Sequence, residues 1–166
     1  MAATSDYKRK PLDRLDRRIL QELQKEGRIS YVDLAERVSL SSTPCIERVK
    51  RLEKDGYIEG YYARLNPALM GYGMLVFVEI SLSYQSPDAF QRFNQAVDTL
   101  PYLLECHLVS GDADYLIKAR INDMSEYRAL LGDMLLTLPG VKNSRSYIVM
   151  EEVKETAQLP VQLQQS

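Results

Sequence analysis

The chain has 166 residues, of which 45% are hydrophobic and 27% charged, and its formal net charge is −2. This composition is typical of a soluble protein with one full-sized domain or two small ones, and no apolar run approaches the roughly 18 residues needed to span a membrane. Two cysteines and one histidine argue against a disulfide framework or a metal site, and the polar, basic first ten residues predict a cytoplasmic protein without a secretory signal.

Three short helices are predicted in the first part of the chain, after a flexible arm of residues 1–11. The first helix has apolar residues at helical spacing up to a glycine that ends the pattern: Leu12, Leu15, Ile19, Leu20, Leu23 and Gly27. The second begins at Ser30, which can cap it, with Asp33 at the reciprocal position of a capping box. The third begins near Ser42, after a turn of only three residues. Two helices joined by so tight a turn are typical of a helix-turn-helix.

The third helix combines an apolar inner side with a polar, basic outer side. Residues 1–66 hold 14 Lys or Arg against 11 Asp or Glu, whereas residues 67–166 hold 7 against 12, so only the first half is net positive. A helix that enters the major groove of DNA needs small polar groups near its start, and cationic groups for guanine edges and phosphates. The DNA contacts predicted on the outer side are Ser42, Thr43, Glu47, Arg48, Lys50 and Arg51.

The sequence divides into two domains with connecting segments. The DNA-binding domain is expected to cover residues 12–62 and to end in a short extended wing. Residues 63–73 form a linker with one proline and two glycines, and residues 74–155 form the second domain. The glutamine-rich residues 156–166 are expected to be a loose tail.

Strands and helices alternate in the second domain in the order βαββαβ. The strands are predicted at 74–84, 103–110, 115–121 and 144–153, with helices that begin at Ser86 and Asp123. The chain is therefore predicted to be α+β, a winged helix-turn-helix followed by a ferredoxin-like sandwich with helices on one face of the sheet. If Leu75, Phe77 and Val109 lie on the other face, that face is expected to pair with a second subunit.

Six stretches, in matching order from about Leu12 to Lys154, carry a family resemblance. They are LDRLDRRIL at 12–20, TPCIERV at 43–49, LEKDGYI at 52–58, LVFVEI at 75–80, ECHLVSGDADY at 105–115 and YIVMEEV at 147–153. Together they resemble the feast/famine, or Lrp/AsnC, family of transcription regulators. The stretches at 75–80 and 147–153 are similar in particular to the leucine-responsive branch of that family.

The resemblance implies a C-terminal domain that dimerises, dimers that assemble into octamers or larger rings, and an amino-acid effector of the leucine or alanine type between dimers. The effector residues that it implies are Leu108, Gly111, Asp112, Asp114, Met124, Leu136, Tyr147 and Val149. Such residues suit a free amino acid, because Asp112 or Asp114 can bind its ammonium group and backbone N–H groups can bind its carboxylate. Taken alone, the acidic turn is also what an ordinary hairpin would contain.

Other functions have less support in the sequence. It holds no catalytic constellation, phosphate loop or nucleophile elbow, so neither enzyme activity nor a cofactor beyond the amino-acid effector is expected. The alternative is an amino-acid-binding regulatory or assembly module whose basic helix contacts another protein rather than double-stranded DNA. Ser39 departs from the family, which usually has glycine in this turn, and a positive φ there should cost serine about 1 kcal/mol.

Overall fold

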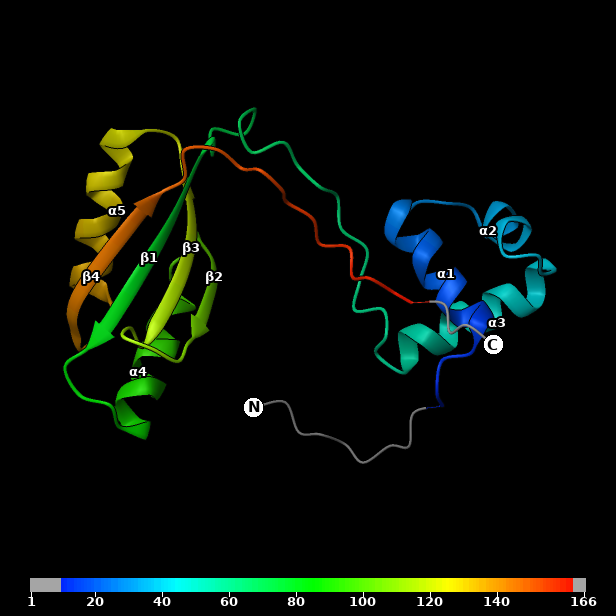
Figure 1. Ribbon diagram of the computed structural model, residues 1–166, viewed down its shortest axis with the longest axis horizontal. Helices are drawn as coiled ribbons and strands as arrows, with labels where there is room; N and C mark the ends of the chain where they lie inside the picture. Colours follow the sequence, from blue (N-terminus) through cyan, green and yellow to red (C-terminus); the bar gives the residue numbers. More distant parts are fainter. Residues whose placement is uncertain (1–9, 163–166) are drawn as a thin grey trace. The chain divides into compact units, whose positions relative to one another are not determined.

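The chain forms two compact units. The structure, a computed structural model, describes residues 10–162. One unit comprises Met1–Ala63 together with Glu155–Ser166, and the other comprises Arg64–Lys154. Figure 1 shows the helices of the first unit and the sheet and helices of the second.

Three helices build the first unit, in the order predicted. They are α1 (Arg14–Lys25), α2 (Tyr31–Arg37) and α3 (Ser42–Lys54). Asp13 caps α1 and Ser30 caps α2, each by accepting a hydrogen bond from the amide three residues later. Their apolar sides meet in a core of the buried residues Ile19, Leu34, Ala35, Val38, Cys45, Val49 and Leu52. This core holds α3 against the other two helices and leaves its opposite side facing outward.

The turn between α2 and α3 contains Ser39 in a left-handed conformation, with a φ of 58°. Two backbone hydrogen bonds close the end of α2 around it. The Ser39 amide donates to the Glu36 carbonyl at 3.0 Å, and the Leu40 amide donates to the Ala35 carbonyl at 2.8 Å. This is the pattern of a Schellman cap, whose left-handed position is usually glycine. The positive φ that the sequence predicts for Ser39 is confirmed.

Replacing Ser39 by glycine is expected to raise the free energy of unfolding of this unit by about 1 kcal/mol, because glycine adopts a positive φ without steric cost. The Ser39 side chain is exposed, so little packing is lost. Calorimetry should show a rise in the thermal midpoint of roughly 4–8 °C. Ser41→Gly is the control, because Ser41 has a negative φ of −77°. An equal gain in both variants would mean that the conformation of Ser39 is not the cause.

Residues 158–162 lie along α1, although the sequence predicts a loose tail there. The Gln21 side chain donates a hydrogen bond to the Val161 carbonyl at 2.7 Å. The Gln24 side chain accepts from the Leu159 amide at 2.6 Å and donates to the Leu159 carbonyl at 3.1 Å. The composition of the tail offers little apolar surface, but the glutamines of α1 bind its backbone as a neighbouring strand would.

The second unit has the predicted order βαββαβ. Its elements are β1 (Met74–Leu82), α4 (Pro87–Val97), β2 (Leu103–Leu108), β3 (Tyr115–Ile121), α5 (Met124–Thr137) and β4 (Val141–Ile148). The strands form one antiparallel sheet in the order β2-β3-β1-β4, which is the ferredoxin-like arrangement. Phe93 of α4 and Met134 of α5 both pack against the same face of this sheet (Figure 1). The predicted fold class is confirmed.

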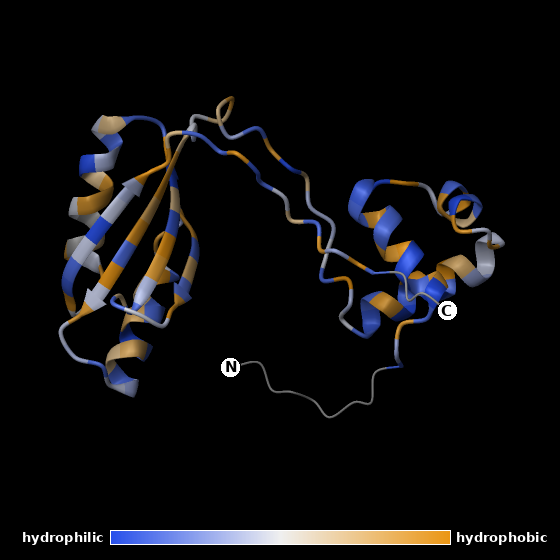
Figure 2. Cartoon of the chain, viewed as in Figure 1, coloured by the Kyte–Doolittle hydropathy of each residue, from blue (hydrophilic) through white to orange (hydrophobic). Residues whose placement is uncertain are grey.

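Hydrophobic residues are concentrated on β1 and β3, the two central strands (Figure 2). Alternate residues of these strands, such as Val78 and Ile117, are fully buried beneath the helices. The residues between them lie on the other face of the sheet, where the strand register sets Leu75 beside Arg120 and Phe77 beside Tyr147. Leu75 and Phe77 therefore lie on the face for which the sequence predicts them.

The predicted bounds of three strands need correction, since β1 ends at Leu82 rather than residue 84, β2 ends at Leu108 rather than residue 110, and the last strand differs at both ends. The sequence predicts a last strand over 144–153, whereas β4 covers Val141–Ile148. The pairing ends there because β1 begins at Met74, and the last bond joins the Val149 amide to the Leu75 carbonyl at 3.0 Å. Residues 57–61, predicted to be a short extended wing, follow α3 without a paired strand. The amides of residues 57 and 58 instead donate to the Leu52 carbonyl at the end of α3.

Candidate functional site

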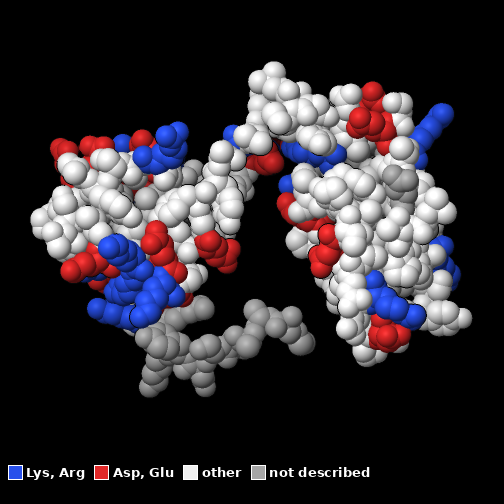
Figure 3. Space-filling view, turned by 180° about the vertical axis from the view of Figure 1, so that it is seen from behind, with Lys and Arg blue, Asp and Glu red and all other residues white. Residues whose placement is uncertain are grey.

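The side of α3 turned away from the core has the chemistry of a DNA contact. The inner residues of α3 are buried, so with about 3.6 residues per turn Thr43, Glu47 and Lys50 point outward. All three are exposed, and Ser42 is half-buried in the first turn. Figure 3 shows Lys and Arg side chains gathered on one side of this unit, with acidic side chains beside them. The outer side of α3 thus offers hydroxyls, one carboxylate and one ammonium group to a duplex.

Arg48 and Arg51, the other two predicted contacts, lie on the flank of α3 that faces α1. Arg48 Nη1 lies 2.6 Å from Asp13 Oδ2 and 2.7 Å from Asp16 Oδ1. Arg51 Nη2 lies 2.5 Å from the same oxygen of Asp16. Asp16 is fully buried, and the two arginine side chains are 27% and 25% exposed. The structure therefore places both arginines in ion pairs within the unit.

Hydrogen bonds favour the charged forms of Asp13 and Arg48. Burial raises the pKa of Asp13, but the hydrogen bonds from the Asp16 amide and the Arg48 guanidinium outweigh burial, and the pKa lies below its usual value. The hydrogen bond to Asp13 in turn raises the pKa of Arg48. The pairing of these residues was not predicted from the sequence. The available signal was the spacing of Asp13 and Asp16, which is that of a capping box in which each side chain binds the other residue's amide.

Three of the predicted effector residues lie at the turn of the β2–β3 hairpin. Gly111 and Asp112 are exposed there, and Gly111 has a φ of 127°, which favours glycine. Asp114, by contrast, is 8% exposed. Its carboxylate accepts hydrogen bonds from the Leu82 amide at 2.7 Å and from the Gln85 side chain at 2.8 Å. Asp112 thus offers an open carboxylate to an ammonium group, whereas the carboxylate of Asp114 is occupied within the chain.

Replacing Asp114 by alanine is expected to lower the free energy of unfolding of the C-terminal unit by about 1–3 kcal/mol, because the buried Leu82 amide loses its acceptor. Asp112→Ala, in the exposed turn, is expected to change it by less than about 0.5 kcal/mol. Urea unfolding followed by circular dichroism measures both. Equal stability of the two variants would show that the carboxylate of Asp114 can be replaced by water.

Four of the remaining five predicted effector residues divide between the two ends of the sheet. Leu108 and Leu136 lie at the end where β1 stops, since Leu108 pairs with the first residue of β3 and Leu136 is in the last turn of α5. Met124 and Val149 lie toward the end where β1 begins, whereas Tyr147 pairs with Phe77 near the middle of β1. At roughly 3.3 Å per residue along a strand, the two ends are about 20 Å apart. A single free amino acid cannot contact both groups within one chain.

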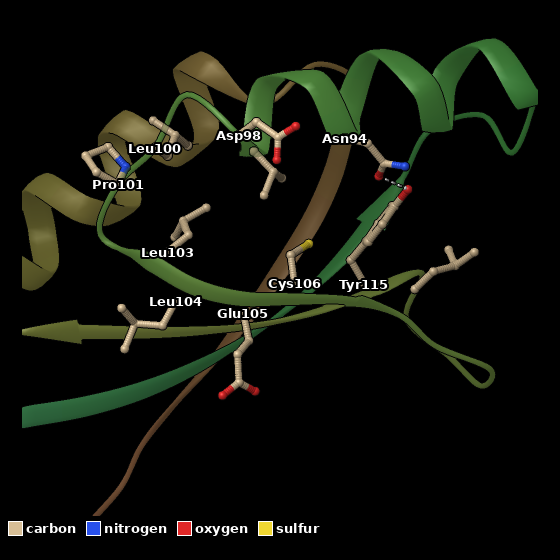
Figure 4. Close-up of a pocket in the computed structure, with 11 residues that line it drawn as sticks. Asn94, Asp98, Leu100, Pro101, Leu103, Leu104, Glu105, Cys106 and Tyr115 are labelled. Carbon is tan, nitrogen blue, oxygen red and sulfur yellow. Dashed lines mark hydrogen bonds between the residues drawn. The ribbon is translucent and has the colours of Figure 1, made fainter. Parts of the chain in front are cut away.

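A hollow of about 490 Å³ lies between α4 and β2, with Leu108 among its lining residues. Figure 4 shows the Asn94 side chain bound to the Tyr115 hydroxyl, which donates to it at 2.9 Å, and the Cys106 sulfur directed into the hollow. Burial, and then the nearby charge of Asp98, raise the pKa of Cys106 to about 11. The thiol therefore stays protonated near neutral pH. Of the eight predicted effector residues, Leu108 alone lines this hollow.

Residues 10–162 contain neither a metal-binding cluster nor a membrane-spanning helix. Nowhere in this part of the chain do three His, Cys, Asp or Glu side chains gather as they would around a metal ion. No helix in the same part has the length and apolar character to cross a membrane.

The two units match two known protein families. Residues 12–59 match the winged helix-turn-helix DNA-binding family, and residues 75–159 match the Lrp/AsnC ligand binding domain. The first match covers α1, α2 and α3, and the second covers nearly all of the sheet and both of its helices. A DNA-binding unit joined to a ligand-binding unit defines the class of ligand-responsive DNA-binding regulators.

Individual relatives agree with both matches. The chain is 58% identical over 159 residues to the leucine-responsive regulatory proteins of Escherichia coli (strain K12) and Klebsiella pneumoniae, across 94% of this chain and 97% of each relative. Its structure is similar to an AsnC family transcriptional regulator from Agrobacterium tumefaciens (TM-score 0.86, 36% identity) and to a transcriptional regulator from Neisseria meningitidis in complex with L-Met (TM-score 0.85, 38% identity). Both comparisons cover 90% of this chain and 97% of the solved one. The chain belongs to the Lrp/AsnC family of transcription regulators, as its sequence motifs indicate.

Proposed function

We propose that this protein regulates transcription in the cytoplasm by binding double-stranded DNA through α3, and that a small amino acid modulates this binding. The observation that carries the proposal is the pairing of a helix-turn-helix, whose outer side is polar and exposed, with an Lrp/AsnC ligand binding domain. The relatives are named for their response to leucine, and the Neisseria structure contains L-Met. Leucine, alanine and methionine are therefore the first effectors to test.

The outer side of α3 is proposed to read base edges. Ser42 and Thr43 are hydroxyl donors and acceptors near the helix start, Glu47 can accept from the cytosine amino group, and Lys50 can bind guanine or phosphate. In a dimer, the two copies of α3 would enter successive major grooves about 34–36 Å apart. The operator is therefore expected to be a pseudo-palindrome.

The C-terminal unit is proposed to form dimers that assemble into an octamer or a larger ring, with the effector bound between dimers. On the helix-free face of the sheet, the half-buried Phe77 lies beside the exposed Tyr147, and this apolar surface supports pairing with a second copy, whereas Leu75 is already buried within one chain. The division of the predicted effector residues between two ends about 20 Å apart supports a shared site, because only two copies can bring both groups to one ligand. Effector binding is expected to change DNA affinity by about 1–3 kcal/mol, or roughly 5- to 150-fold.

Titration of fluorescent duplexes tests the DNA-binding half of this proposal. One duplex carries the promoter region of the protein's own gene, and a second of equal length carries the same bases in scrambled order. Fluorescence anisotropy is expected to show tighter binding to the first duplex and a steep loss of affinity as salt rises. Equal affinity for the two duplexes, or a flat response to salt, would contradict sequence-specific binding.

A thermal-shift screen of the twenty amino acids tests the effector half, since a ligand at 100 times its Kd adds about 2.7 kcal/mol to stability. With the best ligand, Asp112→Asn is expected to retain DNA affinity and to lose the effector response. Asp98→Asn is the matched control, because it removes an exposed carboxylate at the hollow between α4 and β2. Loss of the effector response in Asp98→Asn alone would mean that the effector binds in that hollow and not at the hairpin.

A further inference from the structure

The acidic cluster at the start of α1 has no unused acceptor. Asp13 Oδ1 accepts from the Asp16 amide at 2.8 Å, and Asp16 Oδ2 accepts from the Asp13 amide at 3.0 Å. The other oxygen of Asp13 binds Arg48, and the other oxygen of Asp16 binds both Arg48 and Arg51. Two carboxylates therefore balance two guanidinium groups between α1 and α3, through Nη1 of Arg48 and Nη2 of Arg51. Among the described residues, Nε of Arg51 is buried without a hydrogen-bond partner.

In this network the two arginines bind the carboxylates of Asp13 and Asp16 in place of the DNA phosphates that they could otherwise contact. Carboxylate and phosphate oxygens accept hydrogen bonds from a guanidinium group in the same way, through short, charge-assisted contacts. If Arg48 or Arg51 moved to a phosphate, the fully buried carboxylate of Asp16 would lose a compensating cation, which is costly inside a protein. Asp16 cannot follow them, because it sits in the first turn of α1 and its second oxygen holds the Asp13 amide.

We propose that Asp13 and Asp16 withhold Arg48 and Arg51 from DNA phosphates, and so limit the sequence-independent affinity of α3 for DNA. The proposal rests on the DNA-binding role of α3 and names the residues that control its specificity. Asp13 and Asp16 act as positioning residues in this scheme, since they do not touch DNA themselves. Phosphate contacts add affinity for every sequence, whereas base contacts distinguish between sequences. Withholding two cations therefore lowers the first kind of affinity, to which Lys50 still contributes, and leaves the second kind to Thr43 and Glu47.

Lys50 provides the contrast within the same helix. It is exposed on the outer side of α3, and across residues 10–162 no carboxylate pairs with it. Lys50 and Arg51 are adjacent in sequence and carry the same charge, but only Arg51 has an internal partner. They are therefore expected to contribute differently to the salt dependence of DNA binding.

The test measures affinity for the scrambled duplex between 50 and 200 mM salt. Each phosphate contact contributes about 0.9 to the slope of log K against log salt, or about a threefold loss of affinity over this range. Lys50→Met is expected to lower the slope by about 0.9 for each copy of α3 that contacts the duplex, whereas Arg48→Met and Arg51→Met should each change it by less than half of that amount. If either arginine variant lowers the slope as much as Lys50→Met does, the arginines contact phosphates in the wild type and the proposal is wrong.

Asp13→Asn gives the opposite test, because it releases Arg48 from one carboxylate and asparagine still caps a helix. We expect affinity for the scrambled duplex to rise and its salt slope to steepen by up to about 0.9 for each copy of α3 that contacts the duplex, so that the preference for the promoter duplex falls. The double variant Asp13→Asn/Arg48→Met has the net charge of the wild type and should restore the original slope. Weaker binding of Asp13→Asn to both duplexes would show that the carboxylates orient Arg48 toward DNA, which overturns the proposal.

Two control measurements distinguish a failure of this proposal from a failure of the proposed DNA-binding function. Calorimetry confirms that each variant is folded, and the wild type is titrated with both duplexes in parallel. A wild type that binds neither duplex would contradict DNA binding by α3. A wild type that binds normally, with variants that show none of the expected changes, would contradict only the withholding of the arginines.

Discussion

Replacing Asp16 by alanine is expected to lower the free energy of unfolding of the N-terminal unit by about 3 kcal/mol. The ion pairs themselves need not stabilise the fold, because the removal of their charges from water offsets much of the attraction. Loss of one partner is different, since it leaves Arg48 and Arg51 facing each other without the carboxylate that both bind. The Asp13 amide also loses its acceptor. Native-state hydrogen exchange of the α1 and α3 amides measures the change for this unit alone.

Asp13→Ala is the control for this prediction. The Asp13 side chain is 42% exposed and binds one arginine, so its loss is expected to cost about 1 kcal/mol, which is typical for a helix cap. If Asp16→Ala costs no more than Asp13→Ala, then water reaches the two arginines freely, and the burial of the cluster is not what determines its energy.

Phe93→Ala is expected to lower the free energy of unfolding of the C-terminal unit by about 3–5 kcal/mol. Phe93 is fully buried beneath the sheet, and its ring stacks on that of Tyr115 with centroids 4.2 Å apart. Alanine at this position would leave a cavity between α4 and β3 that the rigid sheet cannot close. Urea unfolding followed by circular dichroism gives the change.

Phe90 offers a matched comparison on the same helix. The centroid of its ring lies 6.1 Å from that of Tyr115 in a T-shaped arrangement, and its side chain is only partly buried. Phe90→Ala should therefore cost less than Phe93→Ala. The reverse order would mean that α4 packs on the sheet through a different side than the structure shows.

Local pattern was enough to predict most of the fold. The period-two alternation of Val76, Val78, Ile80 and Leu82 identifies β1 and the face that it buries. Ser30 and Asp123 cap their helices through hydrogen bonds to amides no more than three residues later in the sequence. Such features depend on neighbours in the sequence. The end of β4 was misplaced because it depends on where β1 begins, about 70 residues earlier.

The same distinction between contacts with sequence neighbours and contacts with distant segments explains which predictions succeeded at the candidate site. The residue types of α3 predict a basic outer side, but a sequence cannot show that Arg48 meets Asp13 and Asp16, which are 35 and 32 positions away. Asp114 looks like a ligand because it lies in an acidic turn, whereas its carboxylate binds the Leu82 amide 32 positions earlier. In both cases the missing information was a charge or a hydrogen bond between distant segments.

The contact between α1 and residues 158–162 affects how the protein is made. Since the DNA-binding unit draws on segments at both ends of the sequence, a ribosome must finish the whole ligand-binding unit before Gln21 and Gln24 of the nascent chain can meet their partners. A fragment that stops at residue 62 would leave both glutamines facing water. Isolated DNA-binding fragments of this protein are thus expected to be less stable than the same helices in the full chain.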